Sequence, residues 1–152
     1  MKINATFKTN KILRKLTTAS KKIAKTTQPL NDAGSYMITQ TTRENIGKEQ
    51  TPEKNKWQPF KAGGRWVGKD TKRRLDKSAK LLQDTGKLRL GVDFLKQTIK
   101  YVIIGISNEA KKYAPYQQRM RRFMGFSPKN RKRIKRIFDL YIKDSIKKSG
   151  IK

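Results

Sequence analysis

The chain has 152 residues, of which 39 are Lys or Arg and 11 are Asp or Glu, so its formal net charge is +28. This length indicates one domain with a modest core, and such an excess of positive charge is typical of nucleic-acid binders and of parts of large assemblies. Because the sequence has no Cys and no His, it excludes a disulfide framework, a cysteine zinc site, a thiol nucleophile and the commonest general base.

Residues 1–28 are predicted to form a basic helical extension that precedes the main domain. The first 31 residues hold eight Lys or Arg and no carboxylate. The apolar residues of this segment recur at the spacing of one helix face: Ile12, Leu13, Leu16, Ala19 and Ile23. A basic, Ser- and Thr-containing start is also typical of organellar transit peptides, which is the less favoured interpretation because the later motifs point away from organelles.

The main domain is predicted to span residues 29–150 and to open with a helix from Pro29 to Ile46. Proline suits the first position of a helix, and apolar residues follow it at spacings of three and four. Gly47 is predicted to end this helix in the left-handed conformation. Residues 48–56 are polar and contain a proline, which predicts a turn.

A basic loop is predicted at residues 61–80. This segment contains eight Lys or Arg together with three glycines, a composition that is typical of a mobile loop. Trp66 and Val67 interrupt the polar run, and we expect them to pin the loop to another surface.

The middle of the chain is predicted to form an antiparallel β-hairpin. Apolar and polar residues alternate from Leu88 to Phe94, which is the pattern of a half-buried strand. A short connection leads to a second strand, Ile99 to Ile106, which is rich in β-branched residues. Gly105 within that strand indicates a bulge or a close approach of the backbone to a neighbour.

The last part of the chain is predicted to be helical. One or two helical turns are expected within residues 108–118. Ser127 can cap a helix that begins at Pro128, runs for about 20 residues and ends just before Gly150. One continuous apolar face supports it: Ile134, Ile137, Phe138, Tyr141, Ile142, Ser145 and Ile146. The predicted fold class is therefore α+β, with long N-terminal and C-terminal amphipathic helices that cover one face of a small, mainly antiparallel sheet.

Nothing in the sequence indicates an enzyme, a cofactor or a metal site. The acids are scattered, and Asp139 and Asp144 are five residues apart on one predicted helix, so they do not share a face. The paired glycines at 63–64 lack the spacing of a phosphate-binding loop. No apolar run approaches the ~20 residues that a membrane helix needs, so we expect no membrane partner.

The strongest electrostatic feature is residues 111–136, which contain eleven Lys or Arg and no carboxylate. Such a run favours polyanion contact with little sequence preference, although a solvated helix face would have the same composition. The residues expected to contact DNA or another polyanion are Lys72, Arg73, Arg74, Arg119, Arg121, Arg122, Arg131 and Arg133. For Phe123 and Phe126, which lie among these cations, a place in the core is the favoured interpretation.

Large aromatic residues near predicted strands indicate core or subunit-interface anchors more often than base-stacking platforms. The residues expected at a subunit or neighbour interface are Trp57, Pro59, Phe60, Trp66, Tyr113 and Phe123.

Five short motifs follow one another along the chain. They are Trp57-x-Pro59-Phe60; LLQDTGKLR from Leu81; VIIG from Val102; Tyr113-Ala114 with Gln117-Gln118; and RFMGFS from Arg122. In this order they resemble the phage virion morphogenesis family, the tail-completion proteins of tailed bacteriophages, over roughly residues 30–146. The sequence departs from that family where Tyr116-Gln117 or Gln117-Gln118 replaces the usual His-Gln and where Met120-Arg121 replaces Pro-Ala.

The resemblance implies a structural virion protein of the phage neck, assembled in the host bacterial cytoplasm, that completes or terminates the tail and joins it to the head connector. Related proteins work as rings, usually of six copies, around the DNA channel. The implied partners are further copies of the chain, other neck, connector and tail-tube proteins, and genomic double-stranded DNA in transient, sequence-neutral contact. We expect the basic loop and the N-terminal helix to reach neighbouring chains.

Two other functions fit the composition. A ribosomal or mitoribosomal protein would thread basic segments through RNA, and a free architectural protein would bind duplex DNA in a salt-sensitive way.

Overall fold

The computed structural model describes residues 9–59, 65–67, 74–76, 81–82 and 86–150. Helices α1 (Thr9–Ala24) and α2 (Thr27–Thr39) are followed by a π-helical segment, η1 (Gln40–Ile46). The short strands β1 (Arg65–Val67) and β2 (Arg74–Asp76) precede the helical turn α3 (Lys87–Leu90) and the strands β3 (Val92–Gln97) and β4 (Val102–Ile106). The 3₁₀ turn η3 (Glu109–Lys112), α4 (Ala114–Met120) and α5 (Pro128–Lys148) follow.

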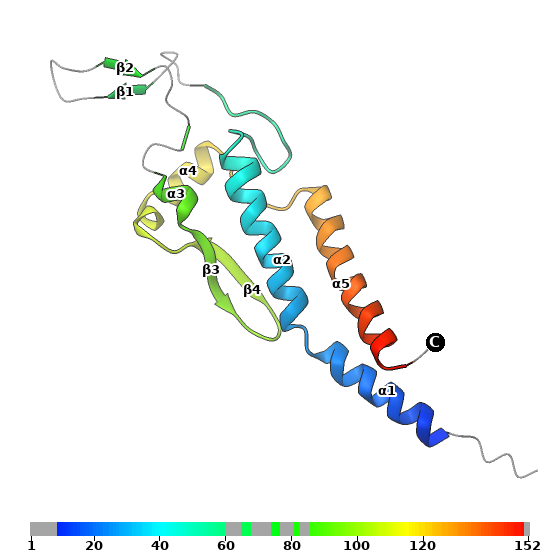
Figure 1. Cartoon of the computed structure of the whole chain (residues 1–152). Coiled ribbons are helices and arrows are strands. Elements are labelled where there is room, and N and C mark those ends of the chain that lie inside the picture. Colours follow the sequence, from blue (N-terminus) through cyan, green and yellow to red (C-terminus); the bar gives the residue numbers. More distant parts are fainter. Residues whose placement is uncertain (1–8, 60–64, 68–73, 77–80, 83–85, 151–152) are drawn as a thin grey trace, which may run out of the picture.

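Helix α2 is the centre of this arrangement. The β3–β4 hairpin packs on one side of it and α5 on the other, while α1 continues beyond the start of α2 along the end of α5 (Figure 1). The predicted α+β class is confirmed. The helix that covers the hairpin is α2, and α5 packs on α1 and α2.

The helix predicted at 29–46 is present as α2 and η1, but its end differs from the prediction. Gly47 has a φ of −63° and is therefore not left-handed. Its N–H donates to the carbonyl of Thr42, five residues earlier, which continues the wider π-helical turn. A Cβ at Gly47 would lie 2.3 Å from the Arg43 carbonyl oxygen, so the glycine is needed for this close approach.

The predicted hairpin is confirmed, but both strands begin later than predicted, the second at Val102 and not at Ile99. Leu88 lies in α3, which starts after Gly86 at a φ of +69°, and β3 starts only at Val92. Leu88 and Val92 are both buried, whereas Leu90 is 81% exposed. The buried pair is four residues apart, which a helical turn explains as well as a strand does.

Gly105 is a point of close approach, one of the two features that the sequence indicated; it pairs with Asp93, and the bulge lies two residues further along β3. β3 and β4 pair antiparallel, and their register shifts between Phe94 and Lys96, which leaves Leu95 as the extra residue. A Cβ at Gly105 would lie 2.5 Å from Leu95 Cδ1, so the bulged leucine packs directly on the glycine backbone.

The described part of the predicted 61–80 loop is not irregular. β1 and β2 pair antiparallel, with the backbone of Trp66 opposite Leu75. Trp, Val and Leu interrupt the basic run here, and Trp and Val favour extended backbone.

The hydrophobic core lies where η1, α3, the end of β4, η3 and α4 meet. Nine buried residues form it: Ile46, Trp57, Leu81, Leu88, Val92, Ile106, Ala110, Ala114 and Phe123. Ile38, Leu82, Ile104 and Met124 pack against them. These positions come from segments spread over most of the described chain, so the core ties the hairpin to the end of the central helix.

The predicted C-terminal helix is confirmed with its caps. The Ser127 hydroxyl accepts a hydrogen bond from the Asn130 N–H at 3.1 Å. At the other end, Lys15 of α1 donates to the Gly150 carbonyl and Lys22 donates to the Lys148 carbonyl. Cations are favourable at a helix C-terminus, so part of the positive charge of α1 is used within the chain.

Candidate functional site

A turn at residues 122–124, just before α5, is held by side chains from three separate segments of the chain, two of them distant in sequence. Three consecutive carbonyls, of Arg122, Phe123 and Met124, each accept a hydrogen bond from a different side chain: Trp57 Nε1 at 3.3 Å, Asn45 Nδ2 at 2.8 Å and Gln118 Nε2 at 2.7 Å. The Oε1 of Gln118 also accepts from the N–H groups of Phe123 and Met124. These bonds fix the backbone between α4 and α5 and therefore the direction in which α5 leaves it.

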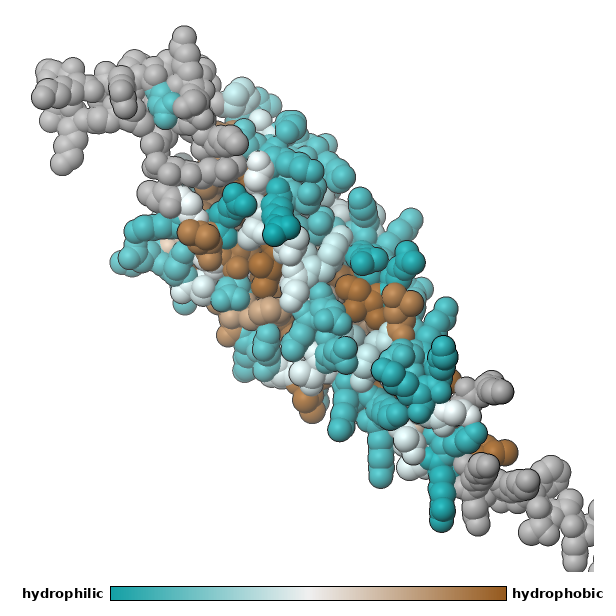
Figure 2. All heavy atoms as spheres, in the orientation of Figure 1, coloured by the Kyte–Doolittle hydropathy of each residue, from teal (hydrophilic) through white to brown (hydrophobic). Residues whose placement is uncertain are grey.

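The 122–124 turn lies within the basic segment, residues 111–136. In the first turns of α5 its cations are all exposed: Lys129, Arg131, Lys132, Arg133, Lys135 and Arg136. Figure 2 shows hydrophilic residues over most of one face, with apolar residues gathered in patches near α3 and β3 and along α5. No carboxylate in the sequence lies between Glu109 and Asp139, so this part of the helix presents one sign of charge.

The residues predicted to contact a polyanion lie on several different elements and do not form one group. Arg131 and Arg133 lie on α5 and Arg119 lies on α4, and all three are exposed. Arg122 forms an ion pair with Glu53, at 3.1 Å between Nη1 and Oε1. Arg121 is half-buried at the end of α4. Arg74 belongs to β2, whereas Lys72 and Arg73 lie outside the described residues.

Arg133 also lines a hollow between α2–η1 and α5 of about 360 Å³, which is bordered by Tyr36, Glu44, Lys54 and Lys129. The Tyr36 hydroxyl donates to Asn130 Oδ1 at 3.0 Å. Burial raises the pKa of Tyr36, while the positive charge of Arg133 acts in the opposite direction. A hydrogen bond from Lys48 lowers the pKa of Glu44. This carboxylate is thus held in its charged form beside the cations of the hollow.

The aromatic residues predicted at an interface have different environments. Trp57 and Phe123 are buried in the core of the chain itself, Phe123 with only 1% of its surface exposed, so they offer little surface to a neighbour. Tyr113 is exposed, as is Pro59. Trp66 belongs to β1, and Phe60 lies outside the described residues.

The expectation that both Phe123 and Phe126 are core residues is right for the first and wrong for the second. Phe126 is 53% exposed. The bonds to the 122–124 turn direct Phe123 inward, and the chain has left the core by Phe126. Asn45 and Gln118, which make these bonds, were not identified as structural residues from the sequence. One local signal of a structural role was present for Asn45: it is a polar residue four positions after Thr41, on the face of the helix that points into the protein.

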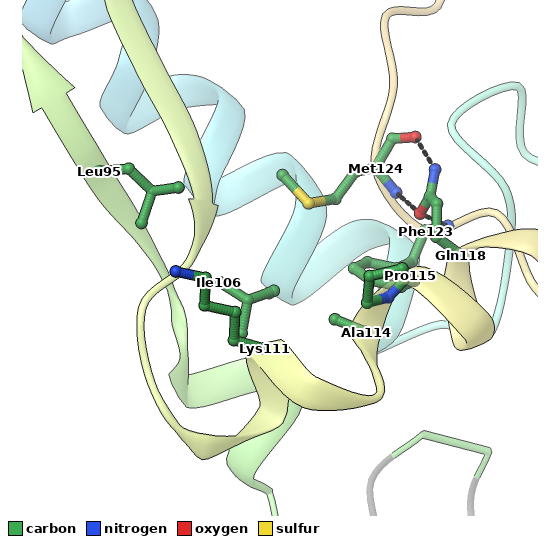
Figure 3. Close-up of a pocket in the computed structure, with 8 residues that line it drawn as sticks. All are labelled: Leu95, Ile106, Lys111, Ala114, Pro115, Gln118, Phe123 and Met124. Atoms are coloured by element: carbon green, nitrogen blue, oxygen red, sulfur yellow. Dashed lines mark hydrogen bonds between the residues drawn. The ribbon is translucent and has the colours of Figure 1, made fainter.

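An apolar cavity of about 310 Å³ opens beside the 122–124 turn. Leu95 of β3 and Ile106 of β4 lie on one side of it, and Phe123 and Met124 lie with residues of α4 on the other (Figure 3). The Gln118 amide is the neighbouring polar group, but its bonds to the turn already occupy it. The other polar residue of the lining is Lys111.

Within the described ranges, no group of three or more His, Cys, Asp or Glu side chains is placed to hold a metal ion. No helix in the same part of the chain has the length and apolar character of a membrane span. The groups that the described site does offer are exposed cations, the amides that bind the 122–124 turn and apolar surface.

No family model, curated protein or solved structure matches this chain significantly.

Proposed function

We propose that this chain is a structural virion protein of the phage neck, which completes or terminates the tail and joins it to the head connector as a ring around the DNA channel. The observation that carries the proposal is the convergence of all five motifs on one core. Trp57, Leu88, Ala114 and Phe123 belong to the buried cluster, and Ile104 of the VIIG motif packs against it. Residues that form one packed unit are a stronger basis for a family resemblance than scattered matches.

The polar bonds connect the same motifs. Trp57 of the first motif and Gln118 of the fourth both bind the backbone of the fifth, at residues 122–124. If Gln117-Gln118, and not Tyr116-Gln117, stands in place of the family's His-Gln, then Gln118 in the Gln position of that motif makes this connection.

The charge fits an assembly better than a DNA-only binder. DNA carries one phosphate per ~1.7 Å, so a ring about 40 Å thick would surround roughly two dozen phosphates. Six copies of a chain with a net charge of +28 carry several times that number of positive charges. Most of the cations would then face neighbouring proteins, and the DNA contact would be transient and sequence-neutral.

The proposal is tested by locating the chain in particles. An antibody raised against it should label tailed particles at the junction of head and tail, and imaging of that junction should show a closed ring, of six copies in our proposal. Label on the capsid surface or the distal tail would contradict it.

A ribosomal or mitoribosomal RNA-binding protein is the second candidate, and the exposed cations at the start of α5 favour it, because they could contact RNA phosphates. The same antibody separates the two. Sedimentation of the chain with ribosomal subunits at one copy each would replace the phage proposal.

A further inference from the structure

The apolar cavity beside the 122–124 turn has the features of a recognition site. Its volume of about 310 Å³ is at the lower end of ligand pockets and can hold a large apolar side chain. Leu95, at its edge, is the extra residue of the β3 bulge and is 49% exposed. An exposed leucine next to an open apolar cavity leaves surface that a partner could cover.

Lys111 supplies the charge at this cavity. Its side chain is part of the cavity lining, as is that of Ile106 (Figure 3). Among the described residues, no carboxylate forms an ion pair with Lys111. The nearest acid in the sequence, Glu109, is bonded to Lys87 instead. The ammonium is therefore available for an anion that enters with an apolar group.

The cations continue beyond the cavity. Lys112 follows Lys111 in η3 and Arg119 follows Gln118 in α4, and both are exposed. Several cations spaced along the surface suit several carboxylates spaced along a chain better than the single head group of a fatty acid. A second copy of this chain is a poor source of the carboxylates that this cavity would take, because it has 11 Asp or Glu against 39 Lys or Arg, even where copies meet through other surfaces in a ring.

We propose that the cavity lined by Leu95, Ile106, Lys111 and Phe123 binds an acidic peptide segment of a partner protein, which inserts one apolar side chain beside Lys111. The apolar side chain supplies affinity by burial, and carboxylates next to it pair with Lys111 and the neighbouring cations. This inference is independent of the proposed function, because it concerns the chemistry of a partner whether or not that partner is a virion protein.

The test begins with selection from a random dodecapeptide library displayed on yeast, with the full-length chain as bait at ~0.15 M ionic strength. Enriched peptides should contain an apolar residue with Asp or Glu at neighbouring positions. The strongest peptide is then labelled with fluorescein, and its affinity is measured by anisotropy. Replacement of its apolar residue by Ser should weaken binding about tenfold, whereas general attraction to a basic protein would be unaffected.

Matched variants locate the binding site. Lys111→Glu should weaken the peptide about tenfold, and Leu95→Asp should do the same by placing a carboxylate at the mouth of the cavity. Lys143→Glu on α5 changes the net charge equally and should have an effect below about threefold. Circular dichroism checks that each variant is folded, and chemical-shift changes on peptide addition should include Leu95 and Lys111.

Several outcomes would overturn the proposal. These are an empty selection, enrichment of acidic peptides without an apolar residue, and equal losses for Lys111→Glu and Lys143→Glu. Displacement of the peptide by decanoate at comparable concentration would instead assign the cavity to a small anionic amphiphile. Self-association of the wild-type chain that Leu95→Asp abolishes would assign it to a second copy.

Discussion

The amide of Gln118 binds the backbone of Met124 on both sides. Its Oε1 accepts from the Met124 N–H at 3.0 Å, and its Nε2 donates to the Met124 carbonyl at 2.7 Å. A primary amide matches a peptide group in this way because it carries a donor and an acceptor side by side. The contact joins α4 to the turn that starts α5, and the turn contributes Phe123 to the core.

Gln118→Leu is therefore expected to destabilise the fold by about 2–3 kcal/mol, because it leaves several backbone groups without partners. The measurement is the free energy of unfolding in urea. Gln58→Leu, at an exposed position, is the control and should change it by less than about 0.5 kcal/mol. Equal effects of the two substitutions would show that the amide contributes nothing specific.

Gly34→Ala is expected to destabilise the fold by about 1–3 kcal/mol through overpacking. A Cβ at Gly34 would lie 2.2 Å from Cε1 of Phe94, so the ring packs directly on the backbone of α2. Phe94→Leu should relieve this clash, and the double variant should be more stable than the sum of the two single changes predicts. Additive free energies of unfolding would contradict the proposed contact.

Tyr141→Phe is expected to loosen α1 from α5. The Tyr141 hydroxyl lies 2.7 Å from the Lys22 carbonyl and 2.6 Å from the Lys25 carbonyl, at the end of α1. Removing it should cost about 1 kcal/mol and raise amide hydrogen exchange in α1 while leaving the β3–β4 hairpin unchanged. If exchange rises equally in both regions, the hydroxyl acts on the whole fold and not on the docking of α1.

The local elements of this chain were more predictable from sequence than its long-range contacts. Ser127, Pro128 and the apolar stripe defined α5 because capping and periodicity act within a few residues. The bond between Asn45 and Phe123 joins residues 78 positions apart, and no local pattern reports it. The start of β3 was predicted too early because the four-residue spacing of Leu88 and Val92 fits a helical turn as well as an alternating strand.

In the candidate site too, the features that depend on composition could be predicted from the sequence, and those that depend on long-range contacts could not. The cations of the basic segment could be identified from composition, since exposure is the usual state of Lys and Arg. The cavity could not, because it requires the bulge at Leu95 and the inward direction of Phe123 at the same time. Trp57, expected in the core or at a subunit interface, is buried in the core, where its indole N–H donates to the Arg122 carbonyl.

The Lys87–Glu109 pair should give a small dependence of stability on pH at both extremes. The hydrogen bond and charge of Lys87 lower the pKa of Glu109 below its ordinary value of 4.5, and those of Glu109 raise the pKa of Lys87 above 10.5. The carboxylate therefore stabilises the fold above about pH 4.5 and loses this contribution as the pH falls through its folded pKa. The ammonium contributes below about pH 10.5 and loses its contribution as the pH rises through its folded pKa.

Lys87→Gln tests this pair. An NMR titration should show the pKa of Glu109 rising toward its ordinary value, while Lys112→Gln, a neutralisation at a nearby exposed position, should leave it where it is. Because both partners are exposed, the change in stability should be small. An unchanged pKa of Glu109 in Lys87→Gln would contradict the ion pair.

The start of α5 should contribute more to polyanion binding than its end, because Asp139 and Asp144 accompany the later cations. The double change Arg131→Gln and Arg133→Gln should lower the affinity of the chain for a short DNA duplex and reduce the slope of log K against log salt by about 0.9 for each phosphate that the variant no longer neutralises. The control, Lys143→Gln with Lys147→Gln, removes the same charge from the same helix and should change the slope much less. Anisotropy titrations over a series of salt concentrations measure both. Equal slopes for the two double variants would mean that the duplex responds only to net charge, and that Arg131 and Arg133 form no contact surface.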